Sequence, residues 1–458
     1  MQTAFADSPT RILTARWLLT MADGDPVREG HALVLAESRV HSVLPLDEAR
    51  QKWPELPVED FGDQVLMPGL VNGHGHGAMT LMRGFADDLP LETWLQERIW
   101  PLEARWVGAE WVADGVELAA AEMIASGTTT FSDMYFFPEA SAAVAHRAGL
   151  RAQICMPLIR FPNAWASGTD EGIHKGLALH DEYRALERIR IAFGPHSTYT
   201  MDFEALQRIA TLAETADLAV QIHLHETADE VETARRETGE RPLETVRRAG
   251  LFGPRLQAVH MAHLEDPDLE ALAEHDVAVI HCPQSNLKLA SGLCRAQDLR
   301  RAGVRTGLGT DGAASNNGLS MFREMHVAAI LAKVVAANAA ALPAMEMLRM
   351  ATLGGAEALG MGEITGSLEP GKAADLIVVD LSGAATTPVF HAESQLVYTG
   401  TAARVTEVRV DGVVLYSRGK HLRLDEATVI DRANRWRDRM RASDPLETAT
   451  ATGAGGAT

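Results

Sequence analysis

Two pairs of histidines in this chain follow apolar, strand-like segments. His74 and His76 come after the run VLMPGLV with one glycine between them, and His223 and His225 come after AVQI. Side chains two residues apart on an extended strand point to the same face. Zinc prefers imidazole nitrogens at about 2.0–2.1 Å in a tetrahedral array. The spacing therefore indicates metal ligands, although one of His223 and His225 is expected to be an ordinary packed histidine.

Two carboxylates stand where they could take part in metal chemistry. Asp311 follows the strand-like run VRTGLGT and precedes the small residues GAAS. An aspartate there could bind a metal and accept a proton from bound water, whereas the alternative is an ordinary helix cap. Glu226 lies three residues after His223, where a carboxylate that is not a ligand could transfer protons.

Three more histidines, His196, His260 and His281, also end strand-like runs. One such histidine would be unremarkable, but core packing does not place a histidine at the end of strand after strand. We therefore expect these side chains to lie around one common site.

The elements that carry these residues alternate between strands and helices. Runs such as RAQICMPLI, RIRIAFGPH and LAVQIHLHE are separated by stretches with helical periodicity, such as FEALQRIATLAETA. This alternation favours a closed parallel barrel or an open doubly wound sheet. An open sheet would gather the polar residues at one switch point, whereas a barrel places its active site at the ends of all its strands. We therefore predict a TIM-type (β/α)8 barrel of the α/β class over residues 68–366.

Short strand-like segments flank this central region on both sides. They occur between residues 11 and 45 and again between 374 and 420, with turn residues between them. We expect residues 1–67 and 367–458 to form one small, discontinuous β-sandwich domain. Its C-terminal part would hold a basic amphipathic helix around RANRWRDRMR and a disordered, low-complexity tail over residues 447–458.

Composition narrows the class of protein. The chain has 458 residues, a formal net charge of -20 and three cysteines without a CxxC pair. The negative charge argues against a nucleic-acid groove or an anionic membrane surface, and the cysteines provide neither a disulfide framework nor a thiolate zinc site. No uncharged run approaches the roughly 20 residues of a membrane span. We expect a cytoplasmic, homo-oligomeric enzyme without nucleic-acid or membrane partners.

Several motifs resemble those of a known superfamily. PGLVNGHGH, IHLHET, AVHMAHL, HCPQSNLKL and GTDGAASNN resemble, in order, the motifs of the amidohydrolase superfamily across nearly the whole chain. MTLMRGFADDLPLETWL, SDMYFFPE and FGPHSTY are similar to the 5-methylthioadenosine/S-adenosylhomocysteine deaminase subgroup. The resemblance implies a barrel with a split sandwich and one metal ion, zinc or another divalent metal such as Fe²⁺ or Mn²⁺. By position, its ligands would be His74, His76, His223 and Asp311.

The resemblance also implies the reaction and further roles. The substrate would be a purine nucleoside, whose 6-amino group is replaced by hydrolysis to give the inosine analogue and ammonia. Glu226 would move a proton to the ring, Asp311 would accept the proton of water, and His260 would orient the attacking hydroxide. His196 would contact the purine and Glu103, in WPLEARW, would hold the ribose hydroxyls. His281 is a further candidate for substrate binding.

One position departs from the family pattern. Relatives that accept the homocysteinyl tail have an Arg shortly after the segment GLRA, and the corresponding residue here is Met156. An apolar Met suits a methylthio group better than a carboxylate, so we predict a preference for 5'-methylthioadenosine. Arg160 is close enough in sequence to substitute for the missing Arg. The strand also lacks the Lys that bridges two metals in binuclear relatives, which favours a single ion.

Alternatives remain open at this point. The same scaffold could deaminate guanine or 8-oxoguanine, or remove amino or chloro groups from triazines. An amide or imide ring hydrolase would usually need two metals and the missing Lys. A catalytically inactive barrel that serves as a binding module is disfavoured by the complete ligand set.

Overall fold

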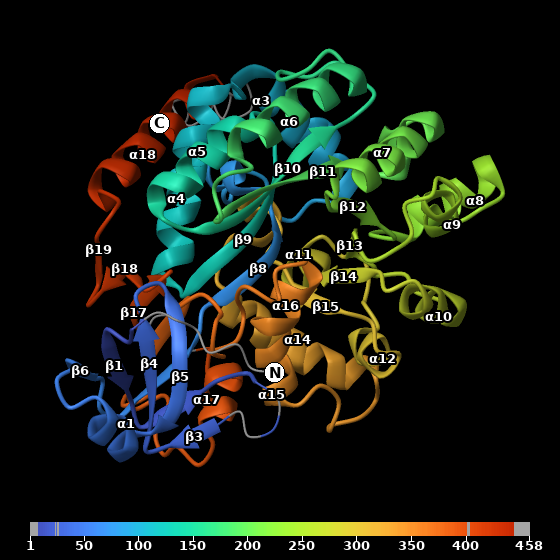
Figure 1. The fold of residues 1–458 in the computed structure, drawn as a ribbon. Coiled ribbons are helices and arrows are strands. Elements are labelled where there is room, and N and C mark those ends of the chain that lie inside the picture. The colour runs from blue at the N-terminus through green and yellow to red at the C-terminus, as the bar shows by residue number, and fades with distance from the viewer. Residues whose placement is uncertain (1–7, 23, 25–26, 401–403, 444–458) are drawn as a thin grey trace, which may run out of the picture.

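The apolar runs between the polar motifs form the strands of a parallel barrel. The computed structural model describes residues 8–22, 24, 27–400 and 404–443. Eight parallel strands follow one another in the order β15-β14-β13-β12-β11-β10-β9-β8 (Figure 1). The strands are β8 (Leu70–Gly75), β9 (Thr128–Met134), β10 (Arg151–Leu158), β11 (Ile189–Pro195), β12 (Val220–Leu224), β13 (Leu256–His260), β14 (Ala278–His281) and β15 (Thr306–Leu308).

The barrel is nearly closed where the segment that follows β15, the last strand, contacts β8, the first strand. The backbone N–H of Asp311 donates to the carbonyl of His74 at 3.0 Å, and the Asn72 amide donates to the Thr310 hydroxyl at 2.7 Å. Gly309 permits this approach, because a β-carbon there would lie 2.9 Å from the backbone N and O of His74. The close contact joins the two segments that carry the candidate ligands.

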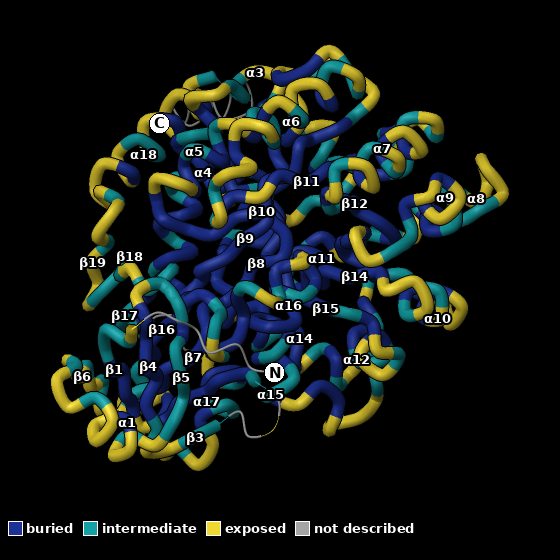
Figure 2. Tube along the Cα trace, viewed as in Figure 1, coloured by how far each residue is buried: buried dark blue, intermediate teal, exposed yellow. Residues whose placement is uncertain are grey.

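Helices cover the outside of the barrel. In α7, the buried residues Leu206, Ile209 and Ala213 recur every three or four positions, so one face packs inward while the other meets solvent. Figure 2 shows the strands buried and the outer faces of α7, α8 and α10 exposed. The main covering helices are α4 (Ala109–Ala125), α5 (Pro138–Ala148), α6 (Thr169–Tyr183), α7 (Phe203–Ala216), α8 (Ala228–Thr238), α9 (Pro242–Arg248), α10 (Asp266–Glu274), α12 (Ala296–Arg301), α14 (Met321–Val335), α15 (Ala344–Met350) and α16 (Leu353–Ala358).

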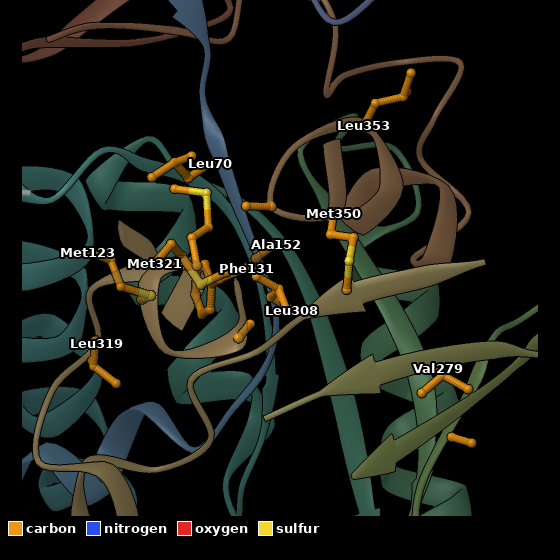
Figure 3. Packing of buried hydrophobic residues seen from close by; sticks show 14 of the residues in the cluster. Leu70, Met123, Phe131, Ala152, Val279, Leu308, Leu319, Met321, Met350 and Leu353 are labelled. Carbon is orange, nitrogen blue, oxygen red and sulfur yellow. The ribbon is translucent and has the colours of Figure 1, made fainter. Parts of the chain in front are cut away.

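The largest hydrophobic core lies between the strands and these helices. Leu70, Phe131 and Leu308 of the barrel share one buried cluster with Met321 of α14 and Met350 of α15 (Figure 3). Because the strand residues of this cluster face the helices, the alternate residues of the same strands face the barrel interior. The inner face of the barrel is thus available for polar side chains.

Strands from both ends of the chain form the second part of the molecule. One sheet has the order β19-β18-β17-β16-β7-β2-β3, and a smaller sheet has the order β5-β4-β1-β6 (Figure 1). In the first, β16 runs antiparallel to β7 with Ile377 opposite Met67. The strands are β1 (Arg11–Thr14), β2 (Trp17–Leu19), β3 (Val27–Glu29), β4 (His31–Ala36), β5 (Arg39–Pro45), β6 (Val58–Asp60), β7 (Gln64–Pro68), β16 (Leu376–Asp380), β17 (Val405–Val410), β18 (Val413–Ser417) and β19 (Lys420–His421). The predicted fold class is confirmed, while the domain boundaries at residues 68 and 366 stay a prediction.

The C-terminal helix α18 (Glu426–Ser443) lies against the barrel helix α4 rather than on the sheets. The Trp436 indole N–H donates to Asp114 at 2.8 Å, and Arg432 donates to the same carboxylate at 2.8 Å. The helix is amphipathic, with Trp436 and Met440 among its buried residues. The expected tail over residues 447–458 lies outside the described residues. Of the helices in the described ranges, none is long and apolar enough to cross a membrane.

Candidate active site

The candidate ligands meet at the C-terminal ends of the barrel strands, where barrel enzymes have their active sites. His74 lies in β8 and His76 directly after it, His223 lies in β12, His260 ends β13, and Asp311 follows β15. His260 and Asp311 have positive φ angles of 75° and 60°. Such strained backbone in non-glycine residues is concentrated at functional sites.

The ligating atoms of these residues form two groups that share His74, one with His76 and Asp311 and the other with His223 and His260. His223 Nε2 lies 3.1 Å from His74 Nε2, and Asp311 Oδ1 lies 3.1 Å from His76 Nε2 and 3.7 Å from His74 Nε2. Tetrahedral zinc with bonds near 2.0–2.1 Å separates its ligand atoms by about 3.4 Å. The ligating atoms of His74, His223 and His260 also lie within 4.8 Å of one another. The spacing fits a divalent metal ion.

Each of the three candidate histidine ligands is held through its Nδ1 atom. The acceptors are the Gln221 side-chain oxygen for His74 (2.7 Å), the Met134 carbonyl for His76 (2.6 Å) and the His196 carbonyl for His223 (2.7 Å). An oxygen of this kind can only accept, so Nδ1 carries the hydrogen and, in a neutral ring, Nε2 carries the lone pair. This is the usual arrangement of histidines around a bound metal. The Nε2 atom of His76 faces Asp311 and carries a second proton near pH 7, which a bound metal ion would replace.

The charges of the cluster suit metal binding. Burial, together with the neighbouring His76, lowers the pKa of His74 to about 3, and burial also holds the pKa of His223 well below its usual value. Both rings are therefore neutral near pH 7. Burial lowers the pKa of His76 too, but the hydrogen bond and charge of Asp311 outweigh it and raise that pKa to about 9.

Asp311 is held in its ionised form by its surroundings. Burial opposes ionisation, but the hydrogen bond and charge of His76 depress the pKa of Asp311 well below its usual value. The hydroxyls of Ser285 and Ser315 donate to its other oxygen at 2.6 and 3.0 Å. Asp311 thus offers one oxygen to the histidines and is fixed through the other.

Glu226 lies beside the cluster without joining its ligating atoms. Its Oε2 is 3.8 Å from His260 Nε2, and its backbone N–H donates to Glu230 at 2.7 Å. Burial raises the pKa of Glu226, because it disfavours the ionised carboxylate. His260 is itself oriented by Asn286, whose side-chain oxygen lies 2.9 Å from Nδ1. The pair can exchange protons with a molecule in the cavity.

A cavity of about 430 Å³ opens above these residues. His76, His196, His223, Glu226, His260 and Asp311 line its inner end. Glu103 lies on another wall, where the Tyr135 hydroxyl donates to it at 2.5 Å. Burial raises the pKa of Glu103 to about 7, and this hydrogen bond only partly offsets the effect.

The outer part of the cavity is mostly apolar, with Asn163, Tyr199 and Thr200 among the uncharged polar residues of the lining. Most of its wall comes from one face of a helical segment made of α2 (Leu91–Thr93), the π-helix η2 (Trp94–Ile99) and α3 (Trp100–Trp106). Among the described residues that line the cavity there is no Lys or Arg. The apolar residues of this outer wall include Leu91, Trp94, Leu95, Ile99, Trp100, Val107, Phe136, Ile159 and Phe161.

The two residues expected to distinguish the substrate tail lie away from the cavity, which corrects the prediction. Met156 is fully buried on the outer side of β10, where a β-carbon on Gly176 of α6 would lie 2.3 Å from its sulfur. Arg160 is about half exposed, packs on Phe161 and pairs with Asp202 at 3.4 Å. Neither is among the described cavity-lining residues. The residues that line this region are Ile159 and Phe161 instead.

Two other histidines are packed outside the cavity. His281 is buried and is not among the residues that line the cavity, so it does not contact the space that a substrate would occupy. The His225 ring accepts a hydrogen bond from the backbone N–H of Leu243 at 3.2 Å. His225 is thus the packed histidine of its pair, as the sequence led us to expect of one of the two.

Sequence reasoning missed the residues that hold the ligands and the aromatic outer wall. Ser285, Asn286 and Ser315 lie within recognised motifs and Gln221 directly precedes one, but none of them has a chemical signature of its own. Leu91, Trp94, Leu95 and Ile99 recur at helical spacing, which is also what core packing produces.

Fold and site together define a metal-dependent hydrolase on a TIM-type barrel. The chain belongs to the amidohydrolase family, whose model matches residues 65–415. A 5-methylthioadenosine/S-adenosylhomocysteine deaminase of Saccharophagus degradans is 46% identical over 94% of this chain and 97% of its own length. One from Thermodesulfovibrio yellowstonii is 39% identical over 95% of this chain and 99% of its own length. The chain therefore falls in the deaminase subgroup that its motifs resemble, as a metal-dependent aminohydrolase.

Solved structures agree with this assignment. A zinc-bound adenosine deaminase from Xanthomonas campestris matches with a TM-score of 0.92 and 45% identity over 94% of this chain and 99% of that one. Atrazine chlorohydrolase from Arthrobacter aurescens, 23% identical, matches with a TM-score of 0.87 over 93% of this chain and 100% of that one. At that identity the second likeness concerns the fold alone.

Proposed function

We propose that this chain hydrolyses the 6-amino group of adenine nucleosides and that 5'-methylthioadenosine is its preferred substrate. The observation that carries the proposal is the cavity, which joins a cluster of metal-ligating atoms and a buried carboxyl at one end to an uncharged apolar wall at the other. The names of its relatives, 5-methylthioadenosine/S-adenosylhomocysteine deaminase and adenosine deaminase, support the same reaction class.

One zinc ion per chain, held by His74, His76, His223 and Asp311, is the second part of the proposal. Three distances between their ligating atoms support this set, since the 3.1 Å of His74–His223 and of His76–Asp311 and the 3.7 Å of His74–Asp311 bracket the separation that tetrahedral zinc requires. Zinc in such a site acts as a Lewis acid that makes water nucleophilic at neutral pH. Fe²⁺ and Mn²⁺ are the competing ions for the same ligands.

The chain's own groups then move the protons. Asp311, ionised in its setting, accepts the proton of the attacking water. Glu226, whose burial favours the protonated form, donates to N1 of the adenine ring and thereby makes C6 electrophilic. His260, oriented by Asn286, directs the nucleophile toward C6. The proton on Asp311 leaves with ammonia, and the proton of the new C6 hydroxyl returns to Glu226 as the carbonyl forms.

Two further residues recognise the rest of the nucleoside. His196 lines the inner cavity, and burial lowers its pKa to about 4, so its neutral ring can hydrogen-bond to the purine. Glu103, fixed by Tyr135, accepts hydrogen bonds from the ribose hydroxyls. Together these contacts would orient the nucleoside in the cavity.

The preference for a methylthio group rests on the outer wall. A carboxylate and an ammonium brought into an apolar cavity lose their hydration and need charged or hydrogen-bonding partners. The described wall supplies Trp94, Trp100, Ile159 and Phe161 instead, against which a methylthio group gains by burial. The preference for a methylthio group is therefore attributed to these wall residues and not to Met156.

Product identification tests the proposal. The purified protein with measured metal content is incubated with 5'-methylthioadenosine, guanine, 8-oxoguanine and a triazine, and ammonia and the deaminated product are quantified. We expect 5'-methylthioinosine and ammonia in equal amounts, with about one zinc per chain, as in a site with three or four protein ligands. Turnover of guanine or the triazine alone would reject the adenine nucleoside, and two tightly bound ions would reject the single site.

A further inference from the structure

Three glutamines fill part of the barrel interior beneath the histidine cluster. Gln153 of β10, Gln221 of β12 and Gln257 of β13 are at most 2% exposed. Branched apolar residues usually fill the interior of such barrels, and a buried amide without hydrogen-bond partners is costly. The proposed function assigns no role to Gln153 or Gln257.

The three amides satisfy one another. Gln153 and Gln257 form a reciprocal pair, in which each side-chain N–H donates to the oxygen of the other at 2.7 and 3.0 Å. The oxygen of Gln257 also accepts from Gln221 at 2.9 Å. Gln153 donates in addition to Ser132, whose hydroxyl lies 3.3 Å from the Gln221 oxygen. Buried networks of this kind hold their members in one arrangement when every group is paired.

The network ends on a candidate metal ligand. The amide nitrogen of Gln221 donates to the Gly73 carbonyl at 3.1 Å as well as to Gln257, which fixes which end of the amide is the oxygen. That oxygen lies 2.7 Å from His74 Nδ1. The His74 ring must therefore donate from Nδ1 and direct its Nε2 lone pair at the cluster.

We infer that Gln153, Gln221 and Gln257 are positioning residues that fix the tautomer and ring orientation of His74 and so raise the metal affinity of the site. Gln221 acts by direct contact, and the reciprocal pair acts one step further away by holding Gln221. The inference rests on the proposed metal site but not on the identity of the substrate.

Zinc affinity, measured by competition with a chromophoric chelator on the full-length protein, tests this inference. Gln221→Met replaces the amide with an apolar side chain of similar length, and we expect zinc binding to weaken about 10- to 100-fold, as for lost partners of metal-bound histidines. Gln221→Glu keeps the acceptor for His74 and should bind zinc more tightly than Gln221→Met. Equal weakness in these two variants would overturn the role of the acceptor.

The double variant Gln153→Met/Gln257→Met tests the remote pair. Replacing both partners together is close to neutral for folding, but it removes one hydrogen bond that holds Gln221, so we expect affinity to fall about 2- to 12-fold. If Gln221→Met does not fold, the double variant alone tests the inference. Gln64→Met, at a partly buried glutamine of β7 in the seven-stranded sheet that donates to Phe61 and accepts from Thr406, is the matched control and should leave zinc affinity unchanged.

A purely structural network would shift the thermal midpoint of the variants and leave their zinc affinity at the wild-type value. That result, with tight binding by the wild-type protein, would overturn this inference alone. A wild-type protein that binds no zinc would overturn the metal site and this inference with it.

Discussion

The two ends of the cavity are built on different principles. At the inner end, each polar side chain is fixed by a further hydrogen bond, as when Gln221 holds His74 and Ser285 holds Asp311. At the outer end, Trp100 and Phe161 line the cavity while about half of each side chain is exposed. The inner end thus has one geometry, whereas the outer end selects by shape and by lack of charge. The proposed function thus assigns reaction type and substrate choice to different segments of the chain.

The largest effect should come from removing two ligands at the inner end. His74→Ala combined with His223→Ala leaves too few ligands for tight binding, so we expect zinc content to fall to background and turnover to disappear. Elemental analysis and ammonia release measure the two effects. The matched control is His225→Asn, at a buried histidine outside the cluster, which should keep its zinc. Full zinc content in the double variant would refute the assignment.

Glu226→Gln should separate chemistry from metal binding. The amide keeps the shape of the side chain but cannot protonate the ring, and loss of a positioned general acid typically costs about 10²- to 10⁴-fold in rate. We expect this loss in kcat with unchanged zinc content. Near-normal turnover would mean that another group donates the proton, and loss of zinc would mean that Glu226 is a ligand.

A cation placed in the outer wall should change substrate choice. Ile159 lines the cavity, so Ile159→Arg offers a partner to the homocysteinyl carboxylate. A charged hydrogen bond of about 1.5–3 kcal/mol corresponds to an improvement of about 10- to 150-fold in relative kcat/KM for S-adenosylhomocysteine.

Met156→Arg is the comparison for that variant. Because Met156 packs against α6, an Arg there buries a charge away from the cavity, so the thermal midpoint should fall without any gain for S-adenosylhomocysteine. If Met156→Arg improves this substrate and Ile159→Arg does not, the assignment of the outer wall is wrong.

The smallest expected effect is a change of KM with pH, which we attribute to Glu103 in the wall of the cavity. Its pKa is raised to about 7 by burial, so the carboxyl is ionised above pH 7 and protonated below it. The ionised form accepts more hydrogen bonds from the ribose hydroxyls, so KM should rise as pH falls through 7, by up to about tenfold per pH unit. Glu103→Gln should have a flat KM over this range. An unchanged pH dependence in Glu103→Gln would assign the effect to another group.

The sequence was informative where chemistry demands rare residue types. Histidines and an aspartate at strand ends predicted the barrel and the cluster, because apolar packing does not place such side chains there. The outer wall could not be predicted, since Leu91, Trp94, Leu95 and Ile99 follow the spacing of any packed helix. Met156 was misplaced because adjacent strand residues face opposite sides. Cys155 faces the barrel interior near Gln153, whereas Met156 faces α6.

The most direct test of the account is a side-by-side measurement of kcat/KM for 5'-methylthioadenosine and S-adenosylhomocysteine on wild-type protein of known zinc content. The two nucleosides share the adenine and ribose and differ only in the 5' substituent, which the outer wall should distinguish. We predict that 5'-methylthioadenosine is favoured by about 10- to 150-fold, the value of one missing charged hydrogen bond. Equal or reversed preference would contradict the account of the outer wall, and deamination of neither would contradict the proposed reaction.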